Sequence, residues 1–287
     1  MIRTIVLALA LTAAGPPAAQ DDGWAQTRAE WNRPTEPFRV ADNLYYVGTA
    51  GLSAWLLTSP QGHILIDGGL AESVPLIEAN IAKLGFRLRD VKILLINHAH
   101  FDHAAGLAAL KRDTGARLLA SAGDKAALEA GGQDYRPDLP GFDPVKVDGV
   151  LREGQEIRLG GNRLVTLLTP GHTKGCTSWS ARVTIGGQAH DALFLCSITV
   201  ADQPLVAGKG YDEAARDFRA TFAKLRGTKA DVLLSFHPGA FDMDAKRAAL
   251  AAGNQDAFVD PGELGRRVDA AEVAFDAELK KQQGAAQ

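Results

Sequence analysis

The sequence has little that would point to a nucleic-acid-binding or membrane-embedded protein. The formal net charge is only −3 at pH 7, with basic and acidic residues interspersed, so no basic groove for nucleic acid is indicated. Beyond the first nineteen residues, no stretch is long and apolar enough to anchor the chain in a membrane. Because 46% of the 287 residues are hydrophobic, the chain can bury one large core, and its length allows one or two domains.

Cysteine is also scarce, with only Cys176 and Cys196 in the chain. A single disulfide between them is compatible with export to an oxidising compartment. Their spacing does not decide whether this bridge forms. The use of Cys196 as a metal ligand is the alternative.

Residues 1–19 have the layout of a secretory signal peptide. Arg3 provides a short positive region, residues 5–14 are uncharged and apolar apart from Thr12, and one glycine, two prolines and two alanines follow. Pro17 interrupts the small-residue pattern at the end of this segment, so the cleavage point stays open, and a buried amino-terminal helix is the alternative. We therefore expect an exported, periplasmic protein whose residues 20–287 form a single domain with no membrane attachment.

The pattern of apolar and turn residues predicts two β-rich halves that carry helices. The predicted strands cover residues 38–40, 44–47, 55–58, 63–66, 91–96 and 118–120 in the first half, and 150–151, 155–159, 163–168, 178–185, 192–196 and 232–234 in the second. The predicted helices cover residues 74–84, 124–130, 211–226 and most of the chain from 243, with a further helix starting at 104. Because no linker separates the halves, we expect one α/β fold, a four-layered αβ/βα sandwich in which the two sheets pack together.

The segment 98–103 concentrates four side chains of the kinds that bind metals, namely His98, His100, Asp102 and His103. It lies where a predicted strand ends and a predicted helix begins, and open α/β sheets usually place their sites at such carboxyl ends of strands. His98 and His100 alternate along extended backbone and so point the same way, while the other two lie past the bend. This density predicts a metal site rather than a set of core histidines.

Two further histidines, His172 and His237, each follow a strand in a turn that contains proline and glycine. His63 and His190 lie beside glycine-containing turns, and we interpret them as solvated turn residues. His172 and His237, together with the four side chains of the segment 98–103, make two sets of three ligands. Zinc takes imidazole nitrogen readily, and three protein ligands leave a position at which water becomes hydroxide near neutral pH. A second zinc would share that hydroxide, and the net positive site would attract anionic substrates.

These motifs resemble those of the metallo-β-lactamase superfamily, from about residue 37 to the carboxyl end. The matching residues are His98-x-His100-x-Asp102-His103, Thr169-Pro170-Gly171-His172-Thr173 and His237. The run from Gly171 to Trp179 and the sequence Phe236-His237-Pro238 look more closely like class B β-lactamases of the third subclass. The resemblance implies the metallo-β-lactamase fold and two zinc ions. The first would be bound by His98, His100 and His172. The second would be bound by His103, His237 and Asp102, which is also a candidate catalytic residue.

The residues that follow Cys196 bear on the choice of substrate. Thioesterases and lactonases of this superfamily commonly have a bridging aspartate here, and this chain has no carboxylate at that point. The resemblance to the third subclass places Ser197 and Thr199 at positions that hydrogen-bond the β-lactam carboxylate, with ordinary strand-end hydroxyls as the alternative. Cys196 lies near a zinc ligand of the first subclass, but His103 already supplies a third ligand, which favours a disulfide to Cys176.

Asp67 ends a strand near the predicted site. It is either an acceptor that orients a ligating imidazole or a turn residue, and both interpretations stay open. Lys174 replaces a proline often found after the Gly-His-Thr run of the family, which leaves the predicted metal ligands intact.

The resemblance implies a periplasmic di-zinc hydrolase that opens β-lactam rings with a metal-bound hydroxide, and therefore a small-molecule β-lactam as its partner. A covalent acyl-enzyme is not expected, since the chain has no Ser-x-x-Lys sequence. We expect a monomer that binds no nucleic acid. The alternatives are an exported di-zinc hydrolase of another ester or lactone, and a zinc-binding protein without catalysis.

Overall fold

The computed structural model describes residues 23–132, 135–208 and 210–285. The predicted signal peptide, residues 1–19, lies outside the described residues. Within the described ranges, no helix combines the length and the apolar character that crossing a bilayer requires.

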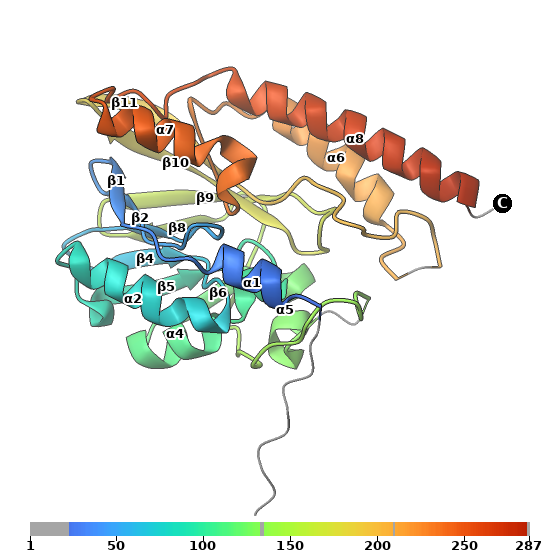
Figure 1. Ribbon diagram of the computed structural model, residues 1–287, viewed down its shortest axis with the longest axis horizontal. Coiled ribbons are helices and arrows are strands. Elements are labelled where there is room, and N and C mark those ends of the chain that lie inside the picture. Colours follow the sequence, from blue (N-terminus) through green and yellow to red (C-terminus); the bar gives the residue numbers. More distant parts are fainter. Residues whose placement is uncertain (1–22, 133–134, 209, 286–287) are drawn as a thin grey trace, which may run out of the picture.

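Two β-sheets form the centre of the molecule (Figure 1). The first sheet holds its strands in chain order, namely β1 (Phe38–Ala41), β2 (Leu44–Tyr46), β3 (Trp55–Leu57), β4 (His63–Ile66), β5 (Val91–Leu95), β6 (Arg117–Ser121) and β7 (Gly149–Leu151). Pairing is antiparallel from β1 to β4 and parallel from β4 to β7. The second sheet has the order β12-β11-β10-β9-β8, formed by β8 (Glu156–Leu159), β9 (Asn162–Leu168), β10 (Thr177–Ile185), β11 (Gln188–Leu195) and β12 (Val232–Ser235). Its pairs are antiparallel except for β11 and β12.

Helices cover the outer faces of both sheets (Figure 1). The first half contains α1 (Ala25–Trp31), α2 (Val74–Lys83), α3 (Phe101–Ala104), α4 (Leu107–Thr114) and α5 (Ala122–Ala130). The second half contains α6 (Ala214–Arg226), α7 (Met243–Ala251) and α8 (Glu263–Ala285). Short 3-10 helices are η1 (Ala71–Ser73), η2 (Leu88–Asp90) and η3 (Pro238–Phe241).

Three apolar cores hold these layers together. The core between the sheets contains the fully buried Trp55 and Trp179. A second core packs α2, α4 and α5 against the outer face of the first sheet. A third packs α6 and α8 against the second sheet around Phe218, Phe222 and Phe275. Burying one large apolar side chain stabilises the fold by roughly 1.5–3 kcal/mol. This arrangement confirms the predicted four-layered αβ/βα sandwich.

Three local features differ from the sequence prediction. The helix α1 was not predicted, and β11 begins at Gln188 rather than at residue 192. The helix after β5 begins at Phe101, so that Asp102 and His103 lie within its first turn. This turn ends before Gly106, where a Cβ would lie 2.2 Å from the Gly68 carbonyl oxygen. The close approach of these two backbones requires glycine and holds the helix start against the end of β4.

Candidate metal centre

The ends of three strands bring distant segments together at one edge of the sheets. Strand β5 leads into the segment 98–103, His172 lies in the loop between β9 and β10, and His237 follows β12. The backbone N–H of Thr177 donates to the carbonyl of Asn97 over 2.8 Å, which joins the first two loops. The structure therefore places His172 and His237 beside the segment 98–103, although they are 69 or more residues away in sequence.

The first three predicted ligands, His98, His100 and His172, form a compact set that fits a metal ion. Their ring centroids are 4.6–4.7 Å apart, and one nitrogen of each lies within 4.8 Å of the others. The Nε2 atoms of His98 and His100 are buried without a hydrogen-bond partner among the described residues. His172 Nδ1–H donates to the Thr199 carbonyl over 2.8 Å, which leaves its Nε2 for a metal. Buried polar atoms normally have partners, so unpaired nitrogens that converge indicate a cation site.

The second three predicted ligands, Asp102, His103 and His237, are still closer together. Asp102 Oδ2 lies 3.2 Å from His103 Nε2 and 3.1 Å from His237 Nε2, and the two Nε2 atoms are 3.2 Å apart. Ligands bound at about 2.1 Å to a tetrahedral zinc ion lie about 3.4 Å from one another, close to this spacing. His98 is also within 4.8 Å of Asp102 and His103, so the two sets adjoin.

Burial keeps the first ligand set neutral, whereas the neighbouring carboxylates hold a proton on His103 of the second set, which a metal would have to displace. Burial lowers the pKa of His98 and His100 well below the usual range and lowers the pKa of His172 to about 4, so these imidazoles are neutral. Burial alone would raise the pKa of Asp102, but the facing histidines lower it well below its ordinary value. Burial disfavours charge on His103, yet the carboxylates on either side raise its pKa to about 10. The second set therefore favours a positive charge between its members.

Asp67 forms a hydrogen bond with one member of the second set, His103. It is buried at the end of β4 and adopts a left-handed backbone conformation with φ 70°. Its Oδ2 accepts a hydrogen bond from His103 Nδ1 over 2.8 Å, and Oδ1 accepts from the Asn97 backbone N–H over 3.0 Å. The Asn97 side-chain amide also donates to Oδ2. Asp67 is thus both a turn residue and the acceptor that fixes the His103 ring.

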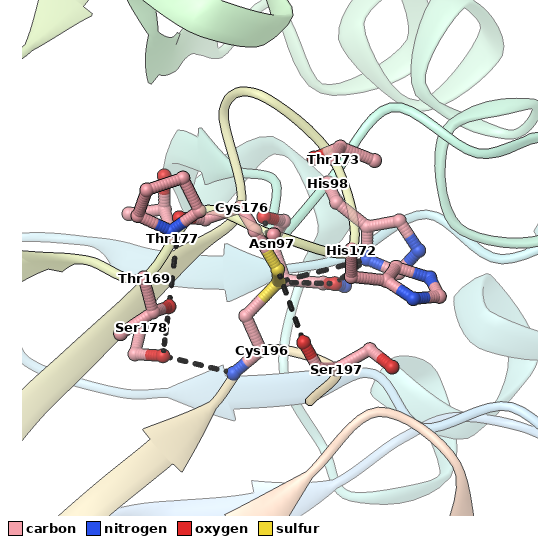
Figure 2. Close-up of a disulfide and its surroundings, with 12 residues drawn as sticks. Asn97, His98, Thr169, His172, Thr173, Cys176, Thr177, Ser178, Cys196 and Ser197 are labelled. Atoms are coloured by element: carbon pink, nitrogen blue, oxygen red, sulfur yellow. Dashed lines mark hydrogen bonds between the residues drawn. A yellow bond between two sulfur atoms is a disulfide. The ribbon is translucent and has the colours of Figure 1, made fainter. Parts of the chain in front are cut away.

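The two cysteines form a disulfide next to the first set, as Figure 2 shows. The Sγ atom of Cys196 lies 3.3 Å from the Asn97 carbonyl oxygen and 3.8 Å from His98 Nδ1. The bridge therefore confirms the favoured pairing of Cys176 with Cys196. With its sulfur in this bond, Cys196 is not available as the metal ligand that was the alternative.

A groove of about 590 Å³ runs along the predicted ligands. His98, His103 and His237 line it. Of the second set, His237 is the most exposed, with 35% of its side chain accessible, against 9% for Asp102 and 1% for His103. Ser197 and Thr199 line the same groove, and their hydroxyl oxygens are 3.0 Å apart. The predicted substrate-binding residues and three of the six predicted metal ligands therefore line one cavity of a size that suits a small molecule.

Two contributions to the site were not predicted. Trp31 of α1 packs its ring 5.4 Å from the His237 ring, centroid to centroid. Trp24 and Trp31 lie seven residues apart, about two helical turns, and this spacing was a signal that one helix face is apolar. The other is Asp124, whose carboxylate accepts hydrogen bonds from the Ala99 backbone N–H and the Thr173 hydroxyl beside the ligands. No sequence signal marked it, because a single aspartate at a helix start usually caps that helix.

Of the two histidines interpreted as solvated, His63 is not. It is buried at the start of β4 and packs its ring 5.1 Å from that of Phe86, edge to face. His190 is half-buried and lies within β11 rather than in the turn before it. Neither residue is near the two ligand sets in the fold, because both lie at the strand ends opposite to the site.

Comparison with known proteins points to one family. The family model for the metallo-beta-lactamase superfamily matches residues 48–237. A solved subclass B3 metallo-beta-lactamase of Bradyrhizobium japonicum is 43% identical with a TM-score of 0.86, over 90% of this chain and 98% of that chain. A native metallo-beta-lactamase from Legionella gormanii is 39% identical with a TM-score of 0.85, over 88% of this chain and 98% of that chain.

Curated relatives are more distant. A metal-dependent hydrolase of Anaeromyxobacter dehalogenans is 30% identical over 205 residues, which cover 71% of this chain and 68% of the relative. A hydroxyacylglutathione hydrolase of Acidiphilium cryptum is 30% identical over 207 residues, which cover 69% of this chain and 72% of the relative.

Proposed function

The chain belongs to the metallo-beta-lactamase superfamily, and we propose that it hydrolyses the amide bond of β-lactams with two zinc ions. The observation that carries this proposal is the pair of three-ligand sets that adjoin at one groove. The choice of a β-lactam is supported by 43% identity to a subclass B3 enzyme over 98% of that chain.

The six ligands divide into two roles in this proposal. The first zinc would be held by His98, His100 and His172, and the second by Asp102, His103 and His237. Bound zinc supplies Lewis acidity to a carbonyl oxygen or a leaving nitrogen and lowers the pKa of water into the neutral range. The chain keeps the first three imidazoles neutral by burial. Thr199 and Asp67 fix the rings of His172 and His103 by accepting their Nδ1–H hydrogens.

We assign Ser197 and Thr199 to the substrate carboxylate. Both hydroxyls line the groove, and with their oxygens 3.0 Å apart they can donate to the two oxygens of one carboxylate. A carboxylate held there lies in the cavity that His98, His103 and His237 also line. This contact would orient a β-lactam ring relative to the predicted metals.

Hydrolysis of a thioester, ester or lactone is the second candidate. The identity of 30% to a hydroxyacylglutathione hydrolase favours it. Against it, Asp102 is the single carboxylate in the potential metal-ligand groups of the described residues. Ser197 stands near the position where thioesterases and lactonases of the superfamily commonly carry a bridging aspartate.

We further propose that the mature protein acts in the periplasm. The predicted signal peptide at residues 1–19 and the disulfide between Cys176 and Cys196 support this location, because disulfides persist in oxidising compartments.

The test is a hydrolysis panel on purified protein with its zinc content measured alongside. Nitrocefin, a carbapenem, an acyl-homoserine lactone and a hydroxyacyl thioester are compared at equal concentration. We expect β-lactam turnover that EDTA abolishes and added zinc restores. Hydrolysis that persists without metal, or that prefers the lactone or thioester, would overturn the proposal.

A double variant tests the substrate contact separately. Ser197→Ala with Thr199→Val should lower kcat/KM for β-lactams about 100-fold or more, because each of the two hydrogen bonds to a charged group contributes about 1.5–3 kcal/mol. Zinc content should stay unchanged, since the Thr199 carbonyl that accepts from His172 is retained. A loss of zinc in this variant would show that the hydroxyls serve the metal centre rather than the substrate.

A further inference from the structure

Asp124 makes hydrogen bonds to both loops that carry the first ligand set. It lies in the first turn of α5 with its side chain buried. Its Oδ2 accepts from the Ala99 backbone N–H over 3.0 Å and from the Thr173 hydroxyl over 2.9 Å. Its Oδ1 accepts from the Gly175 backbone N–H over 2.9 Å. One carboxylate thus contacts two loops that are 74 residues apart in sequence.

Two of these three contacts are directly adjacent to predicted metal ligands. Ala99 lies between His98 and His100, and Thr173 directly follows His172. The first ligand set consists of these three histidines, so the separation of the two loops sets the distances within it. The Asp124 carboxylate links the two loops through its bonds to Ala99 and Thr173 and so fixes that separation.

The start of α5 packs closely against the loop that carries His172, at Lys174 and Gly175. A Cβ at Gly175 would lie 2.3 Å from the Asp124 backbone nitrogen, and one at Gly123 would lie 2.4 Å from the Lys174 carbonyl oxygen. The Ser121 hydroxyl donates to the Gly175 carbonyl over 2.6 Å. These approaches leave little room for the loop to shift while the carboxylate bonds are in place.

We infer that Asp124 is a positioning residue for the first metal site. It holds the His98–His100 loop and the His172 loop at the spacing that one cation needs before any metal binds. The metal therefore does not have to order the loops itself, and its affinity is higher by the cost of that ordering. This inference rests on the proposed metal centre but not on which substrate is hydrolysed.

The test measures zinc affinity with one ligand set intact at a time. His237→Ala disrupts the second set and leaves the first complete, whereas His172→Ala does the reverse. Asp124→Asn is introduced into both backgrounds, because an amide keeps the shape of the side chain but directs its NH₂ group at a donor. Competition with a chromophoric chelator gives the zinc dissociation constant, and thermal unfolding of the metal-free protein reports stability.

We expect Asp124→Asn to weaken zinc binding about 10–100-fold where the first set is intact, the range typical for groups that orient metal ligands. Where the second set is intact, the change should stay below about threefold. The matched control is Glu129→Gln, a carboxylate-to-amide change on the same helix whose partners are Lys125 and the Val147 N–H. This control should leave zinc affinity unchanged in both backgrounds.

Thr173→Val keeps the inference testable if Asp124→Asn fails to fold. It removes one of the three hydrogen bonds and keeps the carboxylate, so it should weaken first-set binding by a smaller factor of about 3–10. Equal losses in the two backgrounds, or a lower unfolding temperature with unchanged affinity, would overturn the inference and leave Asp124 a purely structural residue. A protein that binds zinc as expected but hydrolyses no β-lactam would overturn the proposed function alone.

Discussion

Removal of the disulfide between Cys176 and Cys196 should destabilise the protein by about 3 kcal/mol. The bridge spans a sequence separation of 20 residues. Closing a loop of that length removes chain entropy from the unfolded state that corresponds to about 3 kcal/mol at 25 °C. At the size of this domain, each kcal/mol shifts Tm by about 2 °C, so we expect a fall of about 6 °C.

The assay is thermal unfolding of the double variant Cys176→Ala, Cys196→Ala, followed by circular dichroism. Both cysteines are replaced together so that no reactive thiol is left, and alanine avoids placing a hydroxyl at two buried positions. A chelator is present throughout, because bound metal would raise Tm by mass action. Wild-type protein reduced with a dithiol keeps both sulfur atoms and so separates the loss of the cross-link from the loss of packing.

The reduced wild type and the double variant should unfold within about 2 °C of each other. A fall of less than about 2 °C in both would refute the reasoning from loop closure. The double variant should also weaken zinc binding less than Asp124→Asn does. The hydrogen bond from Thr177 to Asn97 and the Asp124 carboxylate still join the two ligand loops after the bridge is gone.

Two further predictions concern groups that hold the second ligand set. Asp67→Asn should weaken zinc binding and lower kcat/KM about 10–100-fold, because the charged acceptor for His103 Nδ1–H is lost; unchanged chelator competition would contradict this. Trp31→Ala should weaken zinc binding about 2–10-fold in the His172→Ala background, because the ring that packs on His237 is removed. Trp24→Ala is the control for that variant, and an equal effect of both would argue against a specific contact.

Much of the fold could be predicted because the apolar runs are short, regular and bounded by glycine, proline and aspartate. The strand that became β5 and the motif after it placed four candidate ligands at one strand end. His172 and His237 were identified because each follows a strand within a Pro-Gly turn. Parallel pairing of β4 with β5 and of β11 with β12 then brings the carboxyl ends of these strands to the site.

The residues that support the ligands could not be predicted in the same way, because their roles depend on contacts between distant segments. Asp124 looks like an ordinary residue of a helix start until the loops at 99 and 173–175 are placed beside it. His63 looked solvated beside Gly62, but the parallel strand β5 and the Phe86 ring cover it. The periodicity of apolar residues predicts which face of a helix or strand is buried. It does not predict which side chains from distant segments contact that face.

The most direct test of the two-site account is anomalous diffraction at the zinc absorption edge from crystals grown with zinc. The account predicts two peaks, one within each ligand set. One should be bounded by His98, His100 and His172, and the other by Asp102, His103 and His237. Peaks bounded by other side chains, or no peak at either set, would contradict the account.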